Sequence, residues 1–129
     1  MKNRVRKDVF LFVIGVVFIC AMCATAEAQF KVLRRAYDNY VLDNQNHYLA
    51  CKDLPTKTEV ERTIEQHQDV IQQIEQLAPG FVGVEIDSST CEGKADLLIW
   101  YGSHQQRMEI EKIIDRDTFF EIPYRLQNR

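Results

Sequence analysis

Residues 97–101 read Leu97-Leu98-Ile99-Trp100-Tyr101, an apolar run with no polar residue in it. A strand that is solvated on one face alternates apolar and polar residues, whereas a strand covered on both faces is apolar throughout. The run therefore predicts the central strand of a sheet. The rest of the chain is expected to be arranged around it.

Three more stretches have the character of strands. Residues 82–86 alternate apolar and polar residues, which predicts an edge strand with one buried face. Residues 119–126 alternate in the same way and contain Pro123, a residue that an edge strand tolerates because it lacks a backbone donor. Residues 47–51 form a short apolar run that predicts a buried first strand.

Two helices are predicted between these strands. In residues 56–78 apolar side chains recur every three or four positions, after a capping box formed by Thr56 and Glu59. Pro79 and Gly80 end this helix. Ser103 and Gln106 form a second capping box, which opens a shorter helix that closes near residues 115–117.

From residue 46 to residue 129 the predicted order is strand, helix, strand, strand, helix, strand. This is the ferredoxin-like βαββαβ motif of the α+β class, with an antiparallel sheet in the order 4-1-3-2. In that topology the end of the first strand and the loop between the second and third lie at the same end of the sheet. Cys51 and Cys91 occupy these two places, so we expect them to form a disulfide.

The N-terminal residues have the pattern of a secretory signal. Four basic residues within the first seven positions precede the apolar run of residues 9–24, and Ala26-Glu27-Ala28 follows. This pattern predicts a signal peptide of residues 1–28 that is cleaved before Gln29. The alternative is an uncleaved membrane anchor formed by residues 9–26. Either way the domain is expected outside the cytoplasm, secreted or periplasmic, with residues 29–45 as an N-terminal helix or stalk.

The net charge of the chain argues against nucleic acid as a partner. The whole chain has a net charge of -3, and without residues 1–28 it keeps 12 basic and 17 acidic residues, a net charge of -5. Affinity for nucleic acid depends on Lys and Arg that displace counterions from phosphates, so nucleic acid is not expected as a partner. A membrane partner is expected only if the N-terminal segment stays uncleaved.

The search for catalytic and metal-binding patterns gives no candidate. The three histidines, His47, His67 and His104, have no spacing typical of a metal site. Ser88 and Ser89 lie in a predicted turn without a nearby base, and both mature cysteines are assigned to the disulfide. We therefore expect no catalytic residue, no metal and no cofactor, and a protein that is not an enzyme.

The predicted sheet face away from the helices is the expected interaction surface. Its members are Phe81, Trp100, Phe119 and Arg125. Such a surface is expected to be covered by a partner protein, by a second copy of the chain, or by residues 30–43 folding back.

These features predict a small exported non-enzymatic binding or protein-interaction domain. The alternative is a propeptide-like inhibitor of an extracytoplasmic serine protease, which would insert the tail of residues 124–129 into the enzyme.

Overall fold

The chain divides into two compact units, Met1–Ala36 and Tyr37–Arg129. The computed structural model describes residues 2–129, and the side chains of residues 11–22, 25–26 and 30–129. The side chains of the predicted basic region at residues 2–7, and those of Ala28 and Gln29 at the predicted cleavage point, lie outside the described set.

A single long helix, α1 (Lys2–Tyr40), makes up the first unit and ends in the second. Its apolar side chains between Leu11 and Met22 are exposed. Among the described residues, none of the helices combines the length and the hydropathy that a membrane crossing needs.

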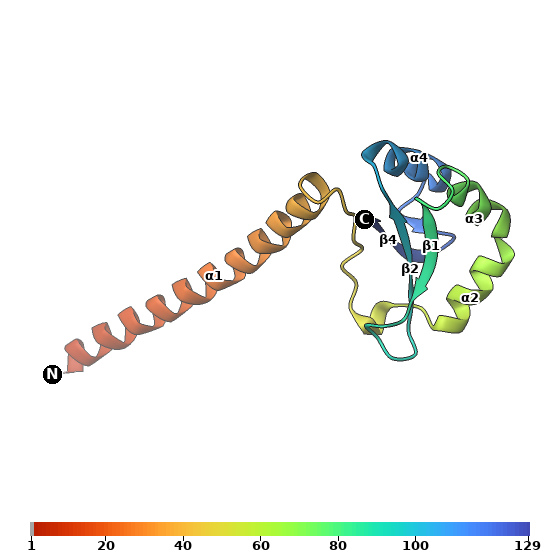
Figure 1. Cartoon of the computed structure of the whole chain (residues 1–129). Coiled ribbons are helices and arrows are strands. Elements are labelled where there is room, and N and C mark those ends of the chain that lie inside the picture. The colour runs from red at the N-terminus through yellow and green to blue at the C-terminus, as the bar shows by residue number, and fades with distance from the viewer. Residues whose placement is uncertain (1) are drawn as a thin grey trace. The chain divides into compact units, whose positions relative to one another are not determined.

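The second unit contains a mixed four-stranded sheet (Figure 1). Its strands are β1 (Gly83–Asp87), β2 (Asp96–Tyr101), β3 (Thr118–Phe119) and β4 (Ile122–Asn128), in the order β1-β2-β4-β3. β1 runs antiparallel to β2, β2 parallel to β4, and β3 antiparallel to β4.

This order corrects the predicted ferredoxin-like 4-1-3-2 arrangement, because residues 47–51 do not form a strand. Tyr48 has a left-handed backbone (φ 55), and its N–H donates to the side chain of Asn46 at 2.9 Å. A short 3-10 helix, η1 (Cys51–Asp53), follows. A local hydrogen bond of this kind, from backbone to a nearby side chain, competes with the hydrogen bonds of a strand. The C-terminal strand β4 takes the position beside β2 that the first strand was expected to fill.

The expected position of β2 is confirmed and that of β4 is not. β2 lies between two strands, and β1 is an edge strand as predicted. β4 was predicted as an edge but is internal, with β3 beside its first residues and Gln45 bridged to Leu126 further along. Pro123 is accommodated because the pairing of β4 with β2 begins only at Tyr124.

The predicted strand 119–126 is in fact two strands joined by a tight turn. Phe120 (φ 48) and Glu121 (φ 73) both have left-handed backbones, as the two central residues of a type I′ hairpin turn require. Such turns usually carry Asn-Gly or a similar pair. A Phe-Glu pair is no sequence indication of a turn, so the hairpin could not be predicted.

The predicted helix of residues 56–78 is divided into α2 (Lys57–Gln66) and α3 (Gln68–Glu75). The break is at His67, whose backbone is not helical (φ -124, ψ 35). The capping box of Thr56 and Glu59 is confirmed, with both reciprocal hydrogen bonds present.

The last helix, α4 (His104–Ile114), begins after Ser103, whose hydroxyl accepts from the N–H of Gln106. The reciprocal half of the predicted capping box is displaced by one residue. The Gln106 side chain accepts from Gly102 instead of from Ser103.

The three helices α2, α3 and α4 supply the apolar residues that bury one face of the sheet (Figure 1). Leu97, Ile99 and Tyr101 of β2 point into this core and are fully buried. The intervening residues of β2 therefore point to the opposite face, which we call the open face. The helical contribution to the core comes from four residues, Val60, Ile71, Ile74 and Ile110.

Candidate functional site

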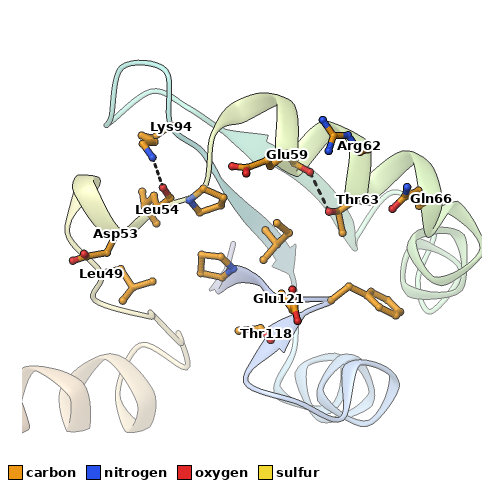
Figure 2. Close-up of a pocket in the computed structure, with 14 residues that line it drawn as sticks. Leu49, Asp53, Leu54, Glu59, Arg62, Thr63, Gln66, Lys94, Thr118 and Glu121 are labelled. Carbon is orange, nitrogen blue, oxygen red and sulfur yellow. Dashed lines mark hydrogen bonds between the residues drawn. The ribbon is translucent and has the colours of Figure 1, made fainter.

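A groove of about 690 Å³ lies between three segments of the second unit (Figure 2). Its walls are the segment of residues 49–55, the outward side of α2, and the β3–β4 hairpin. Charged side chains of both signs and apolar side chains line it together: Leu49, Asp53, Leu54, Pro55, Glu59, Arg62, Thr63, Gln66, Lys94, Thr118, Phe120, Glu121, Ile122 and Pro123.

The first wall is held in place by the disulfide. Cys51 and Cys91 are bonded as predicted, with Cα atoms 5.5 Å apart across 40 positions of sequence. Close by, Lys94 Nζ donates to the carbonyl of Leu54 at 2.8 Å, and the N–H of Ala95 donates to Pro55. These bonds attach a segment without regular strands to the loop before β2. The disulfide is compatible with an extracytoplasmic location.

The second wall is one side of α2, which contributes Glu59, Arg62, Thr63 and Gln66. Thr56 donates through both its backbone N–H and its hydroxyl to the Glu59 carboxylate, each at 2.7 Å. These hydrogen bonds hold the pKa of Glu59 below its usual range, so this carboxylate stays charged in the groove. The Thr63 hydroxyl also bonds to the Glu59 carbonyl, at 3.0 Å (Figure 2).

The third wall is the tight turn at Phe120 and Glu121. The Phe120 side chain is 47% exposed, and its ring stacks on His67 with centroids 3.4 Å apart and planes 5° apart. Phe119 meets Phe120 edge-on at 5.0 Å. Non-glycine residues with left-handed backbones are strained, and such strain is frequent at binding and catalytic sites. The strain here holds an aromatic ring at the rim of the groove.

A smaller apolar pocket of about 240 Å³ lies on the other side of the same turn. Val70, Ile113, Ile114 and Phe119 line it together with Thr118, Phe120 and Arg116. Phe120 and Thr118 are thus shared between the pocket and the groove.

The open face carries a charge cluster in addition to the apolar side chains of Leu98, which is buried, and Trp100, which is half-buried. Asp96 is 4% exposed and accepts from Arg125 Nε at 2.5 Å and from Arg125 Nη2 at 2.9 Å. His47 Nε2 lies 2.7 Å from Asp96 Oδ2, and the Leu49 N–H donates to His47 Nδ1 at 3.0 Å. Since Nδ1 accepts a hydrogen bond, Nε2 carries the proton and donates to Asp96.

Burial and hydrogen bonding shift the pKa values in this cluster in opposite directions. Burial alone would raise the pKa of Asp96, but hydrogen bonds from His47 and Arg125 outweigh it and leave the pKa lowered. The pKa of Asp87 is lowered to about 2, mainly by hydrogen bonds from Ser89 and then from Arg125. The hydrogen bond to Asp96 raises the pKa of Arg125. All three groups therefore remain charged at neutral pH.

The four residues predicted as an interaction surface do not lie together on an open surface. Phe119 is 1% exposed, because the unexpected turn places it in the core. Trp100 is half-buried on the open face, and the side chain of Arg125 is engaged by Asp87 and Asp96. Only Phe81 is largely exposed, at 70%.

Residues 30–43 were one of the expected covers of this face. Tyr40 and Val41 are 84% and 65% exposed, so their side chains are not buried against the sheet. The last turn of α1 instead approaches α4, where Arg107 donates to Asn39 and to Asp43. His47, from the segment that was predicted as a strand, is the residue that contacts the open face.

The groove was missed in the sequence because its walls come from three segments far apart in the chain. Its strongest local indication is the Phe119-Phe120 pair before Pro123, where two neighbouring aromatic residues cannot both point into the core of a strand. That pattern could have indicated an exposed aromatic residue at residue 120.

Among the described residues, no three His, Cys, Asp or Glu side chains are grouped so that they could hold a metal ion. Comparison of the chain with protein-family models, with curated proteins and with solved structures found no match.

Proposed function

We propose that this chain is an exported, non-enzymatic binding protein whose groove takes an extended segment of a partner protein. The observation that carries the proposal is Phe120. It is an aromatic side chain held half-exposed by a strained turn at the rim of a groove of about 690 Å³. Exposed aromatic side chains in preformed hollows are typical energetic centres of protein interfaces.

The lining of the groove favours a polypeptide over a small molecule. Its apolar residues include Leu54, Ile122 and Pro123. Two basic and three acidic side chains line it as well: Arg62, Lys94, Asp53, Glu59 and Glu121. An extended peptide presents apolar side chains, charges and backbone polar groups in alternation. Such a ligand matches a lining in which all three kinds of group are mixed.

Export is part of the same proposal. The N-terminal sequence has the order of a signal peptide, and the Cys51–Cys91 disulfide needs an oxidising compartment. We expect a mature protein that begins at Gln29 and is secreted or periplasmic. N-terminal sequencing of the exported protein tests this, and a chain that begins at Met1 in the membrane fraction would instead support an anchor of residues 9–26.

The propeptide-like inhibitor is the second candidate, and the structure offers it less support. Its mechanism needs a free tail, but residues 124–128 belong to β4 and the side chains of Tyr124 and Leu126 are buried. Insertion of these residues into a protease would require removal of a strand from inside the sheet.

A displayed library of linear peptides, selected on the exported protein, tests the groove. We expect enriched peptides whose affinity falls at least about tenfold in Phe120→Ala, since loss of an aromatic anchor costs about 2 kcal/mol or more. Phe81→Ala is the matched control, because Phe81 is exposed to 70% and does not line the groove.

Binding that survives Phe120→Ala unchanged would contradict the groove as the site. Loss of binding in Phe81→Ala alone would move the site to the surface around that residue. A library that yields no enriched peptide would contradict the proposed ligand class.

A further inference from the structure

β1 is an edge strand whose outer side is unpaired. Within residues 2–129, β1 forms a ladder only with β2. Its residues Val84 and Ile86 point toward the helices but are only half-buried, whereas their β2 partners Ile99 and Leu97 are fully buried. The difference shows that the outer side of β1 is uncovered.

β1 has few of the features that usually prevent edge-to-edge association. Edge strands are commonly protected by proline, by bulges or by charged side chains. β1 contains no proline, and both of its acidic residues are paired within the chain. Asp87 lies 2.5 Å from Arg125, and Glu85 lies 2.9 Å from Arg129.

We propose that β1 pairs with β1 of a second copy of this chain, antiparallel about a two-fold axis at Val84. The two sheets would then form one continuous sheet, with new backbone hydrogen bonds along the joined edges. None of the residues of β1 lines the groove, so this inference does not rest on the proposed function.

The charges select this register. With Val84 opposite Val84 of the second copy, Glu85 faces Gly83 of that copy. Gly83 lies directly under Trp100, since a Cβ added to it would come within 2.3 Å of Trp100 Cζ2. The Arg129 guanidinium is 5.8 Å from the centre of the Trp100 ring. Glu85 of each copy would therefore approach Arg129 of the other.

The neighbouring symmetric register is disfavoured. An axis at Glu85 would place the Glu85 side chains of the two copies directly opposite each other, and like charges at opposed positions of an antiparallel ladder are destabilising. The axis at Val84 avoids this repulsion and brings each Glu85 near Arg129 of the other copy in addition to Arg129 of its own chain.

Analytical ultracentrifugation of the exported protein, with two charge-reversal variants, tests the pairing. We expect a dimer for the wild type, and a dissociation constant raised at least about tenfold in Glu85→Arg and in Arg129→Glu. An equimolar mixture of the two variants should recover dimers, because each then supplies the charge that the other lacks. Glu65→Arg makes the same charge change at an exposed position of α2 and should leave the dimer unchanged.

The mixture separates an intermolecular contact from the contact within one chain. Both variants have lost their internal ion pair, so only pairing between copies can restore association. A wild-type protein that remains monomeric at about 0.1 mM would overturn the proposal. A dimer that resists Glu85→Arg, or a mixture that stays monomeric, would overturn it as well.

Discussion

Asp96 and Arg125 form a two-point ion pair on the open face of the sheet, with N–O distances of 2.5 and 2.9 Å. They come from adjacent parallel strands that are separated by the whole of α4 in the chain. His47 Nε2 forms a further hydrogen bond with the Asp96 carboxylate, at 2.7 Å. The Asp96–Arg125 pair joins β2 to β4. The contact between Asp96 and His47 attaches the segment that leads into the first wall of the groove.

Replacement of Asp96 by Asn should strongly destabilise the fold. It leaves the largely buried guanidinium of Arg125 with Asp87 as its remaining acidic partner, and a broken buried ion pair costs about 3 kcal/mol. Urea denaturation measures the change in the free energy of unfolding. Asp53→Asn, at an exposed position, should change it by no more than about 0.5 kcal/mol. Equal effects of the two substitutions would contradict the role of Asp96.

Asp87 should make the stability depend on pH in the acid range. The pKa of Asp87 in the folded protein is about 2, below the ordinary value of 3.8. Its contribution, about 2 kcal/mol, is therefore present at neutral pH and is lost as the pH falls from about 4 to about 2. Denaturation at a series of pH values should show this loss in the wild type and a shallower one in Asp87→Asn. Identical slopes would contradict it.

The disulfide should supply a large part of the stability. Cys51 and Cys91 close a loop across 40 positions, which corresponds to about 4 kcal/mol in the chain-entropy model. The double variant Cys51→Ser, Cys91→Ser and the reduced wild type should unfold at the same, lower urea concentration. A thiol titration of the denatured, unreduced mature protein should find no free thiol. Two free thiols would show that the bond does not form.

Arg107 should anchor the residues that follow α1. Its side chain is 8% exposed and bonds to Asp43 at 2.9 Å and to Glu111 at 2.8 Å. Arg107→Met should cost about 3 kcal/mol, because it removes a buried guanidinium and leaves the partly buried carboxylate of Asp43 with the exposed His104 as its remaining charged contact. Arg116→Met, at an exposed position, is the matched control. Asp43→Asn should recover part of the loss in the Arg107→Met background, and strict additivity of the two changes would contradict their coupling.

Release of the turn strain should stabilise the protein. Glu121→Gly places glycine at φ 73, where it is unstrained, and should raise the free energy of unfolding by about 1 kcal/mol. Glu121→Ala should give no gain, because alanine is strained there too. A gain in the alanine variant would show that loss of the Glu121 charge, and not backbone strain, is responsible.

Local pattern was sufficient for several elements of the fold. The capping box at Thr56 and the start of α4 after Ser103 depend on side chains within a few residues of one another, and both were predicted. The apolar run of residues 97–101 gave β2 its central position because every residue in it had to be covered. The Cys51–Cys91 pairing was also correct, although the first strand used to argue for it does not form.

Features that depend on contacts between residues far apart in the chain could not be predicted from local pattern. The break at His67 and the turn at Phe120 are unfavourable locally, and the rings of these two distant residues stack against each other. The segment that contains His47 is attached to the sheet by Asp96, which lies 49 positions further along the chain. Groove residues come from segments that no local pattern connects.

The sequence by itself determined the acidic balance, the disulfide partners, the residues at which α2 and α4 begin and the central strand, because each depends on composition or on neighbours along the chain. The tertiary structure alone decided that β4 and not residues 47–51 lies beside β2, that Phe119 is buried while Phe120 is exposed, and that Arg125 binds two aspartates. The physical reason is that these outcomes are set by competition between distant segments for the same partners. Asp96 accepts from both His47 and Arg125, and the strand position beside β2 accepts only one strand.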